Sequence, residues 1–202
     1  MAVKDRNGKT EAEFLRDYDV TKYFRPSVTV DAVLYRVLSA DALRVLLIKR
    51  GGHPYIGMFA FPGGFVEKDE DCETAVAREL MEETGVVGVS LCQLVTASTP
   101  DRDPRWRNIT VVYCGEVKDD IDFAAGDDAA DARWFDIRLV GSTLKFAAID
   151  GTESFDCTLD IARDAFGHVD INNTKIVERG CVAFDHAKII CYLINELTRR
   201  TR

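Results

Sequence analysis

The sequence predicts an α+β or layered α/β/α domain in which a mixed β-sheet lies between helices. Three observations lead to this fold class. Segments with the composition of strands outnumber segments with helical periodicity, and the first two strand segments follow each other closely enough to form an antiparallel pair. The chain has 202 residues, of which 47% are hydrophobic, and this suits one core better than two full domains.

The N-terminal part is predicted to be a tail followed by a hairpin. Residues 1–24 form the tail, with a short helix near 11–18. Pro26 ends this region, because proline disfavours helix in the residue before it. Residues 27–38 and 43–50 are rich in valine, leucine and isoleucine, so they predict two paired strands, at least one of them buried on both faces.

The middle of the chain holds the clearest helix signal. A short strand over 59–66, interrupted by a proline and two glycines, leads to a helix over 72–84. Asp71 is suited to cap the start of this helix, and Gly85 is suited to end it. Two further strands are predicted, over 87–98 and 108–117.

The C-terminal part is predicted to add strands and a final helix. Residues 140–180 alternate weakly and contain turn signals, so they predict a β-rich insertion that either covers a site or builds a subunit contact. The last segment has apolar residues at the spacing of one helix face, namely Ile189, Ile190, Leu193, Ile194 and Leu197. We therefore expect residues 25–202 to form one domain that contains the insertion.

Charge and composition narrow the class of function. The formal net charge is −8, and such a field repels phosphate backbones, so neither nucleic acid nor an anionic membrane is expected as a partner. The polar start does not resemble a signal peptide, and no stretch approaches the roughly 20 apolar residues of a membrane span. The six cysteines lack metal-ligand spacing and predict buried thiols in a reducing cytoplasm.

The helix over 72–84 concentrates acidic side chains. Glu79, Glu82 and Glu83 share one face about 100° wide, and four other residues are expected to face the core, namely Val76, Ala77, Leu80 and Met81. Like charges at Glu79 and Glu83 cost a few tenths of a kcal/mol, and the neighbouring cation is Arg78. A solvated face is one interpretation. The alternative is a bound divalent cation, for which oxygen ligands favour Mg²⁺, Mn²⁺ or Ca²⁺ over Zn²⁺.

The spacing over 64–86 favours the second interpretation. Gly64, five residues, Glu70, seven residues and then RELMEETGV match the box GX5EX7REUXEEXGU, in which U is aliphatic, at every specified position. The sequence therefore resembles the Nudix hydrolases, and the fold implied is the Nudix sandwich. The order of strands and the closing VAFDHAKII are also similar to that family, whereas 140–180 has no counterpart that we can name.

The resemblance implies hydrolysis of the diphosphate in a nucleoside diphosphate linked to another group, with Mg²⁺ as cofactor and Mn²⁺ as a substitute. The roles matched to the box are these: Glu79 and Glu83 are metal ligands, Gly63 or Gly64 offers a carbonyl, Glu82 is a third or water-mediated ligand with a catalytic role, Arg78 orients the carboxylates, Glu70 braces the loop against the helix, and Gly85 is structural. Bound cations would reverse the sign of an acidic pocket and acidify a water molecule.

The stretch STPDRDPRWRNITVVY bears on the substrate. Pro100, which follows Gly85 by 15 residues, is similar to a proline of the ADP-ribose pyrophosphatase subgroup. A local basic cluster follows, made of Arg102, Arg105 and Arg107. Arginine contacts phosphate through two nitrogens and stacks on aromatic rings, so we expect these residues to bind substrate. Solvated arginines paired with neighbouring aspartates are the alternative.

The stretch AGDDAADARWF supplies candidates for a general base. In similar Nudix enzymes an acidic residue of this loop acts as the base or as an extra metal ligand, so the resemblance assigns that role to Asp127 or Asp128. Ordinary turn residues are the alternative. His53 and His186 are expected to be structural, because neither lies near a second candidate metal ligand in the sequence.

Three functions remain open. The first is hydrolysis of ADP-ribose to AMP and ribose 5-phosphate, and the second is hydrolysis of nucleoside triphosphates, including oxidised ones. The third is a nucleotide-sensing domain without catalysis, because residues 23–36 and 182–190 are similar to Nudix-type regulators. The intact box and the few residues after 186 argue against this third function. Related enzymes are often homodimers, so a homodimer is the expected assembly.

Overall fold

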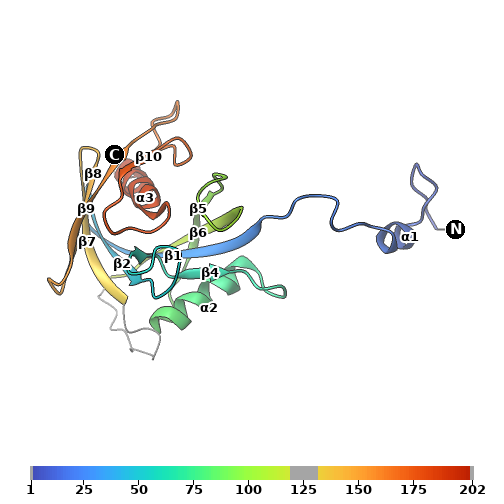
Figure 1. Ribbon diagram of the computed structural model, residues 1–202, viewed down its shortest axis with the longest axis horizontal. Helices are drawn as coiled ribbons and strands as arrows, with labels where there is room; N and C mark the ends of the chain where they lie inside the picture. Colours follow the sequence, from blue (N-terminus) through green and yellow to red (C-terminus); the bar gives the residue numbers. More distant parts are fainter. Residues whose placement is uncertain (1, 119–131, 201–202) are drawn as a thin grey trace.

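A computed structural model describes residues 2–118 and 132–200 of the chain (Figure 1). Its elements in chain order are α1 (Glu11–Arg16), β1 (Ser27–Ser39), β2 (Ala42–Lys49), β3 (Phe59–Ala60), β4 (Gly63–Phe65), α2 (Cys72–Thr84), β5 (Cys92–Ala97), β6 (Asn108–Glu116), β7 (Ala132–Val140), β8 (Thr143–Ala148), β9 (Ser154–Asp160), β10 (Lys175–Glu178) and α3 (His186–Arg200). The strands form one sheet in the order β10-β9-β8-β7-β2-β1-β6-β5, with β3 paired to β2 and β4 to β1. Strands β1 and β6 are parallel and β1 and β2 antiparallel, so the predicted mixed sheet is confirmed.

Strand β1 shows why the sheet needs a helix on each face. Successive side chains of a strand point to opposite faces. Val30 and Leu34 pack in the core beneath α2, whereas Val33 and Tyr35 pack in the core beneath α3. The two helices lie on opposite sides of the sheet in Figure 1. The predicted α/β/α sandwich is therefore confirmed, and so is a strand that is buried on both faces.

Helix α2 begins and ends where the sequence predicts. Asp71 Oδ1 accepts a hydrogen bond from the backbone N–H of Thr74 at 2.8 Å, which caps the first turn. Gly85 has φ 71°, the left-handed conformation that glycine adopts without steric cost. Both signals are local in the sequence, so they fix the helix bounds without help from tertiary contacts.

The buried face of α2 differs from the expected one. Ala75, Val76, Leu80 and Thr84 are buried, whereas Met81 is 46% exposed and Ala77 is also exposed. The prediction that Ala77 and Met81 face the core is therefore wrong. Val76, Leu80 and Thr84 form a buried row at intervals of four residues. In the neighbouring row Ala75 is buried, whereas Glu79 and Glu83 are only partly buried.

The short segment around Pro62 pairs with two strands in turn. Strand β3 pairs with β2, and β4 pairs with β1 so that Gly63 lies opposite Asp31 and Gly64 opposite Val30. The predicted interrupted strand is thus confirmed as two pieces. As a consequence, the two glycines lie beside β1 in the sheet and next to Glu79 and Glu83 in the second half of α2.

Two outer regions complete the chain. The strand predicted over 87–98 begins only at Cys92, because Gly88 has φ 74° and breaks the extended conformation. The strands predicted within 140–180 are confirmed, since β8, β9 and β10 continue the sheet beyond β7 and add Leu144 and Leu159 to its core. That this region is an insertion stays a prediction. Residues 2–26 extend away from this body in Figure 1. No helix of the described segments is long and apolar enough to cross a membrane.

Candidate active site

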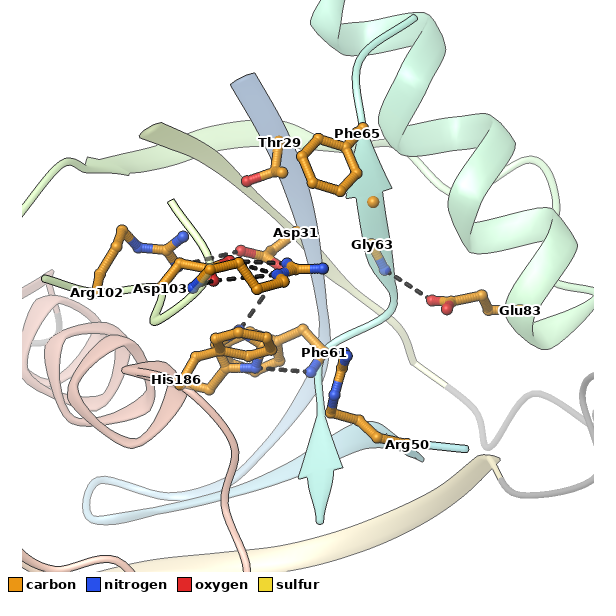
Figure 2. Close-up of a pocket in the computed structure, with 13 residues that line it drawn as sticks. Thr29, Asp31, Arg50, Phe61, Gly63, Phe65, Glu83, Arg102, Asp103 and His186 are labelled. Carbon is orange, nitrogen blue, oxygen red and sulfur yellow. Dashed lines mark hydrogen bonds and ion pairs between the residues drawn. The ribbon is translucent and has the colours of Figure 1, made fainter. Parts of the chain in front are cut away.

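A cavity of about 260 Å³, which we call the cleft, opens between α2, the loop after β5 and the start of α3 (Figure 2). Its lining consists of Thr29, Asp31, Arg50, Phe61, Gly63, Gly64, Phe65, Glu83, Arg102, Asp103, Arg105, Phe184 and His186. The cleft therefore brings together Gly63 and Gly64, which with Pro62 we call the glycine turn, one box glutamate and two of the predicted arginines. No residue of β8, β9 or β10 lines it, so within the described segments the insertion does not cover this site.

Glu83 forms the acidic wall of the cleft. Its Oε2 accepts a hydrogen bond from the backbone N–H of Gly63 at 2.8 Å (Figure 2). Burial raises the pKa of Glu83 to about 7; the Gly63 hydrogen bond opposes this effect, and the nearby charge of Glu79 adds to it. The folded protein thus holds a carboxylate where its negative charge is unfavourable unless a cation is close.

Arg78 connects the other box glutamates. Its guanidinium donates to Glu70 at 2.7 and 3.1 Å, to Glu79 at 2.8 Å and to Glu82 at 3.1 Å. A further bond reaches the carbonyl of Phe65 at 3.1 Å, which joins the helix to β4. This geometry suits the orienting role predicted for Arg78 and the bracing role predicted for Glu70. Both roles remain predictions.

The glycine turn allows the acidic helix to approach β1 and β4. A Cβ at Gly64 would overlap the carboxylate of Glu79, and a Cβ at Gly63 would overlap the carbonyl oxygen of Val30. Neither position therefore accepts a side chain without a shift of its neighbours. The close approach leaves the Glu79 carboxylate against the backbone of β4, where the sequence predicts a carbonyl ligand.

The donor set on this face fits a hard divalent cation. Glu79 and Glu82 share the guanidinium of Arg78, Glu83 bonds a backbone N–H, and carboxylate oxygens are the ligands that Mg²⁺ and Mn²⁺ prefer. Within residues 2–118 and 132–200, no three acidic, histidine or cysteine side chains already converge as a ligand group. Arg78 and the Gly63 N–H hold the carboxylates apart instead.

The loop between β5 and β6 carries the predicted substrate-binding arginines, and Arg102 is the most buried of them. Its side chain is 4% exposed and binds both oxygens of Asp185, at 2.7 and 3.1 Å. Its Nη2 is also 3.8 Å from Asp31. Arg102 lines the cleft, but its charge is used inside the protein to join the loop to α3 and β1.

Arg105 is more accessible. Its side chain is 42% exposed, binds Asp103 at 2.7 Å, and lies 5.4 Å from the ring of Phe65 and 5.8 Å from the ring of Phe184. A guanidinium held between two rings at the mouth of a cleft is well placed for an anionic or aromatic ligand. Arg107 donates to the carbonyl of Asn108 and, like the exposed Pro100, does not line the cleft.

His186 and Phe61 form a wall that the sequence did not indicate as part of a site. The Nδ1 of His186 accepts from the backbone N–H of Phe61 at 2.9 Å, and the two rings stack at 4.5 Å. Its Nε2 is 3.7 Å from Asp31. Burial lowers the pKa of His186, so the ring is neutral near pH 7. A structural role was expected for this histidine, and its position in the cleft was missed.

Arg50 links the cleft to a second cavity of about 230 Å³. The guanidinium lies 4.8 Å from the ring of Phe184 and donates to the carbonyl of Pro54 at 2.8 Å. The second cavity shares Arg50 and Glu83 with the cleft and also includes Lys49 and Ala132. No local motif indicated Arg50, because only β2 and the turn after it bring it opposite α2. Asp127 and Asp128 lie outside the described residues, so their assignment stays a prediction.

Comparisons with known proteins agree with this geometry. The chain is 43% identical over 120 residues to an ADP-ribose pyrophosphatase of Methanocaldococcus jannaschii, a match that covers 57% of this chain and 64% of that protein. A MutT/nudix family protein from Enterococcus faecalis superposes with a TM-score of 0.72 at 36% identity, covering 96% of this chain and 71% of the other. The NUDIX domain of Shewanella oneidensis NrtR, solved with ADP ribose, superposes with a TM-score of 0.53 at 36% identity, covering 62% and 82%.

The extent of the match is the decisive fact. The NUDIX domain family matches residues 26–153, which is more than half of the chain. This range includes the glycine turn, α2 and residues 98–107 between β5 and β6, which we call the arginine loop. The match to the curated relative spans slightly less than two thirds of that relative's length. The complete box runs over 64–86 and includes α2, and the sheet lies between two helices. The chain belongs to the Nudix family.

Proposed function

We propose that this protein hydrolyses the diphosphate of nucleoside diphosphate derivatives, with ADP-ribose cleaved to AMP and ribose 5-phosphate in the presence of Mg²⁺ or Mn²⁺. The observation that carries the proposal is a single cleft with two unlike walls. Glu83 and the glycine turn form an acidic wall, and Arg50 and Arg105 with Phe184 form a basic and aromatic wall. A diphosphate flanked by ring-shaped groups is complementary to that pair of walls.

The acidic wall is where the chemistry would take place. Glu79, Glu83, Glu82 and the carbonyl of Gly64 are the groups that would hold divalent cations. Such cations, when bound, offset the charge of the diphosphate and make a water molecule more acidic. Arg78 fixes the carboxylates by its hydrogen bonds to Glu79 and Glu82 and by its bond to the backbone of β4. A ligand set that is ordered before binding costs less to assemble.

The opposite wall would bind and orient the substrate. Arg50 and Arg105 both lie over the ring of Phe184 and carry positive charge toward the cleft. Guanidinium groups bind phosphate through two nitrogens, and rings stack on nucleobases. Arg102, which binds Asp185, would position this wall through the loop, so its contribution to substrate binding is indirect.

A general base is the remaining part of the mechanism. The box glutamates would be occupied by metal, so we propose Asp127 or Asp128 as the acceptor of the proton from the attacking water. In support, Ala132, which follows these aspartates in the chain, lines the second cavity together with Glu83. A positioned acceptor contributes about 10²–10⁴-fold to such a reaction.

The choice of ADP-ribose rests on relatives as well as on geometry. The relative from M. jannaschii is an ADP-ribose pyrophosphatase, and the NrtR domain was solved with ADP ribose. The similarity to the NrtR domain, which was solved with ADP ribose, also favours one alternative. In this alternative the domain binds ADP-ribose as a signal without hydrolysing it. A nucleoside triphosphate pyrophosphohydrolase is the other alternative.

A substrate panel separates these functions. The purified chain would be incubated with ADP-ribose, other nucleoside diphosphate derivatives and nucleoside triphosphates, with Mg²⁺, Mn²⁺ or chelator, and the products read by phosphatase-coupled phosphate release. We expect the highest kcat/KM for ADP-ribose and no turnover in chelator. A higher kcat/KM for a triphosphate would replace the proposed substrate. A rise in melting temperature with ADP-ribose and no turnover would establish the sensing function instead.

We further propose that the chain works as a homodimer. In the segment 2–26, no side chain of α1 is buried, and several large apolar side chains are exposed, among them Leu15, Tyr23 and Phe24. An arm with such exposure gains free energy by packing against another surface. The double substitution Tyr23→Ser and Phe24→Ser is expected to shift the molar mass measured by light scattering from dimer to monomer, and a wild-type monomer would refute the proposal.

A further inference from the structure

Two cysteines far from the cleft face each other across neighbouring strands. Cys92 begins β5 and lies directly opposite Cys114 of β6 in the antiparallel register. Their sulfur atoms are 3.8 Å apart, and the Cys92 sulfur is also 3.6 Å from the carbonyl oxygen of Cys114. The expectation of a buried thiol is confirmed for Cys114 and is wrong for Cys92, which is exposed and adjacent to a second thiol.

The backbone already permits a bond between these sulfurs. Directly opposed residues of antiparallel strands have Cα atoms about 4.5–5.5 Å apart, within the range of about 4.4–6.8 Å found for disulfides. The sulfurs would have to close from 3.8 Å to about 2.05 Å, which rotation of the side chains supplies without a change of register. Strand β5 is the last strand of the sheet, so it has a free edge along which it can adjust.

The two thiols differ in access, as exchange in two steps requires. Cys92 is exposed, whereas Cys114 is 7% exposed and lies beneath it. Both line a cavity of about 260 Å³ between β5, β6 and α3, whose other walls include Tyr35, Tyr192 and Glu196. A small disulfide reagent therefore has a hollow in which to reach Cys92, and Cys114 is next to the bond that would form.

We propose that Cys92 and Cys114 form a thiol–disulfide exchange site whose reaction partner is a low-mass disulfide. Cys92 loses its proton to solvent and attacks one sulfur of the reagent, which forms a mixed disulfide and releases one thiol of the reagent. Cys114 then loses its proton and attacks the Cys92 sulfur, which forms the Cys92–Cys114 bond and releases the second thiol. Two electrons pass from the cysteines to the reagent.

The bond would act on the hairpin that carries the arginine loop. Strands β5 and β6 enclose residues 98–107, and Arg102 and Arg105 lie on that segment. A disulfide between the strands restricts the unfolded chain and fixes the register of β5, so it stabilises the hairpin. In a reducing cytoplasm the pair remains as thiols until low-mass disulfides accumulate.

The test is intact-mass and peptide analysis of the full chain. Wild-type protein, Cys114→Ser and the control Cys181→Ser would be treated with oxidised glutathione in mildly alkaline buffer and then alkylated. We expect wild-type protein and the control to lose two hydrogens and to yield a Cys92–Cys114 linked peptide. We expect Cys114→Ser to retain glutathione on Cys92, because no second thiol resolves the adduct. Oxidation should also raise the melting temperature of wild-type protein and leave that of Cys114→Ser unchanged.

Two results would overturn the proposal. The first is a stable glutathione adduct on Cys92 in wild-type protein, as persistent as in Cys114→Ser. The second is a linked peptide in wild-type protein that contains a cysteine other than these two. Cys92→Ser provides an independent measurement, because the buried Cys114 should then react at least about tenfold more slowly than Cys92 does in Cys114→Ser.

Discussion

The acidic face of α2 and the arginine loop after β5 neutralise their charges in opposite ways. Glu70 in the loop before α2 and Glu79 and Glu82 on α2 share the guanidinium of Arg78, and Glu83 accepts a hydrogen bond from a backbone N–H. In the loop, each of two arginines at the cleft has a carboxylate of its own. Arg102 binds Asp185, and Arg105 binds Asp103. One region therefore holds a surplus of negative charge, and the other is balanced.

We infer from this difference that the buried pair of Arg102 and Asp185 serves the fold, whereas the carboxylates of α2 serve a ligand. The balanced loop is already complete, so its buried arginine stabilises the native state. Under the proposed function, this surplus costs the metal-free protein stability and bound divalent cations would offset it; a charge left unfavourable in this way is the usual sign of a functional site. Four experiments break or sharpen this comparison, and they follow in order of expected effect.

Removing one carboxylate of the surplus should have the largest effect. We expect Glu83→Gln to lower kcat for ADP-ribose by at least about 10³-fold, since metal stabilisation of a transition state is worth several kcal/mol. The circular dichroism spectrum should stay native, because the substitution is nearly isosteric. Glu73→Gln, at an exposed position of the same helix, is the matched control and should retain wild-type turnover. Equal rates for the two variants would refute the metal assignment.

The proposed base should have the next largest effect. We expect either Asp127→Asn or Asp128→Asn, and not both equally, to lower kcat by about 10²–10⁴-fold with little change in KM. Steady-state kinetics with ADP-ribose measures this, with melting temperature as the control for folding. Wild-type rates in both single variants and in the double variant would instead make Glu82 the suspected base, because its side chain is 51% exposed and the least enclosed of the three.

Substitutions in the arginine loop should mainly change the free energy of unfolding. We expect Arg102→Met to lower the free energy of unfolding by about 3–5 kcal/mol, because Asp185 and Asp31 lose a buried cation. Arg105→Met should cost less than about 1 kcal/mol, since this arginine is 42% exposed, but should raise KM for ADP-ribose.

Urea unfolding and steady-state kinetics measure the two effects. Asp103 keeps bonds to the side chain of Asn108 and to the backbone N–H of residue 105, which explains the small expected loss in Arg105→Met. Equal stability losses in the two variants would contradict the distinction between a structural and an accessible arginine.

The smallest effect concerns pH. Burial raises the pKa of Glu83 from 4.5 to about 7, so ionisation of this group costs the metal-free protein stability as pH rises from about 4.5 through 7. We expect Glu83→Gln to be more stable than wild type in chelator near pH 8, by roughly 1–3 kcal/mol, and to show no such gain near pH 4.5. Urea unfolding at the two pH values measures the difference. An equal gain at both pH values would show that the charge of Glu83 is not the cause.

The sequence by itself determined the acidic helix. Asp71 and Gly85 fixed the ends of α2, and the box placed Glu79, Glu82 and Glu83 together on one face of it. Such signals depend on contacts a few residues apart, which the chain makes in almost any fold. That Val76, Leu80 and Thr84 are buried while Met81 is left out depended on which face of α2 packs against the sheet.

Only the tertiary structure decided which residues form the basic and aromatic wall of the cleft. Arg102 meets Asp185 across 83 residues, and Phe61 meets His186 across 125 residues. Before folding, nothing distinguishes Arg102 from Arg107, because both are arginines of one polar loop. The parallel pairing of β1 with β6 and the packing of residues 181–186 beside β3 bury the first of them and leave the second outside the cleft. Contacts between distant segments therefore assign each arginine its role, because burial and pairing depend on surroundings that no short stretch of sequence contains.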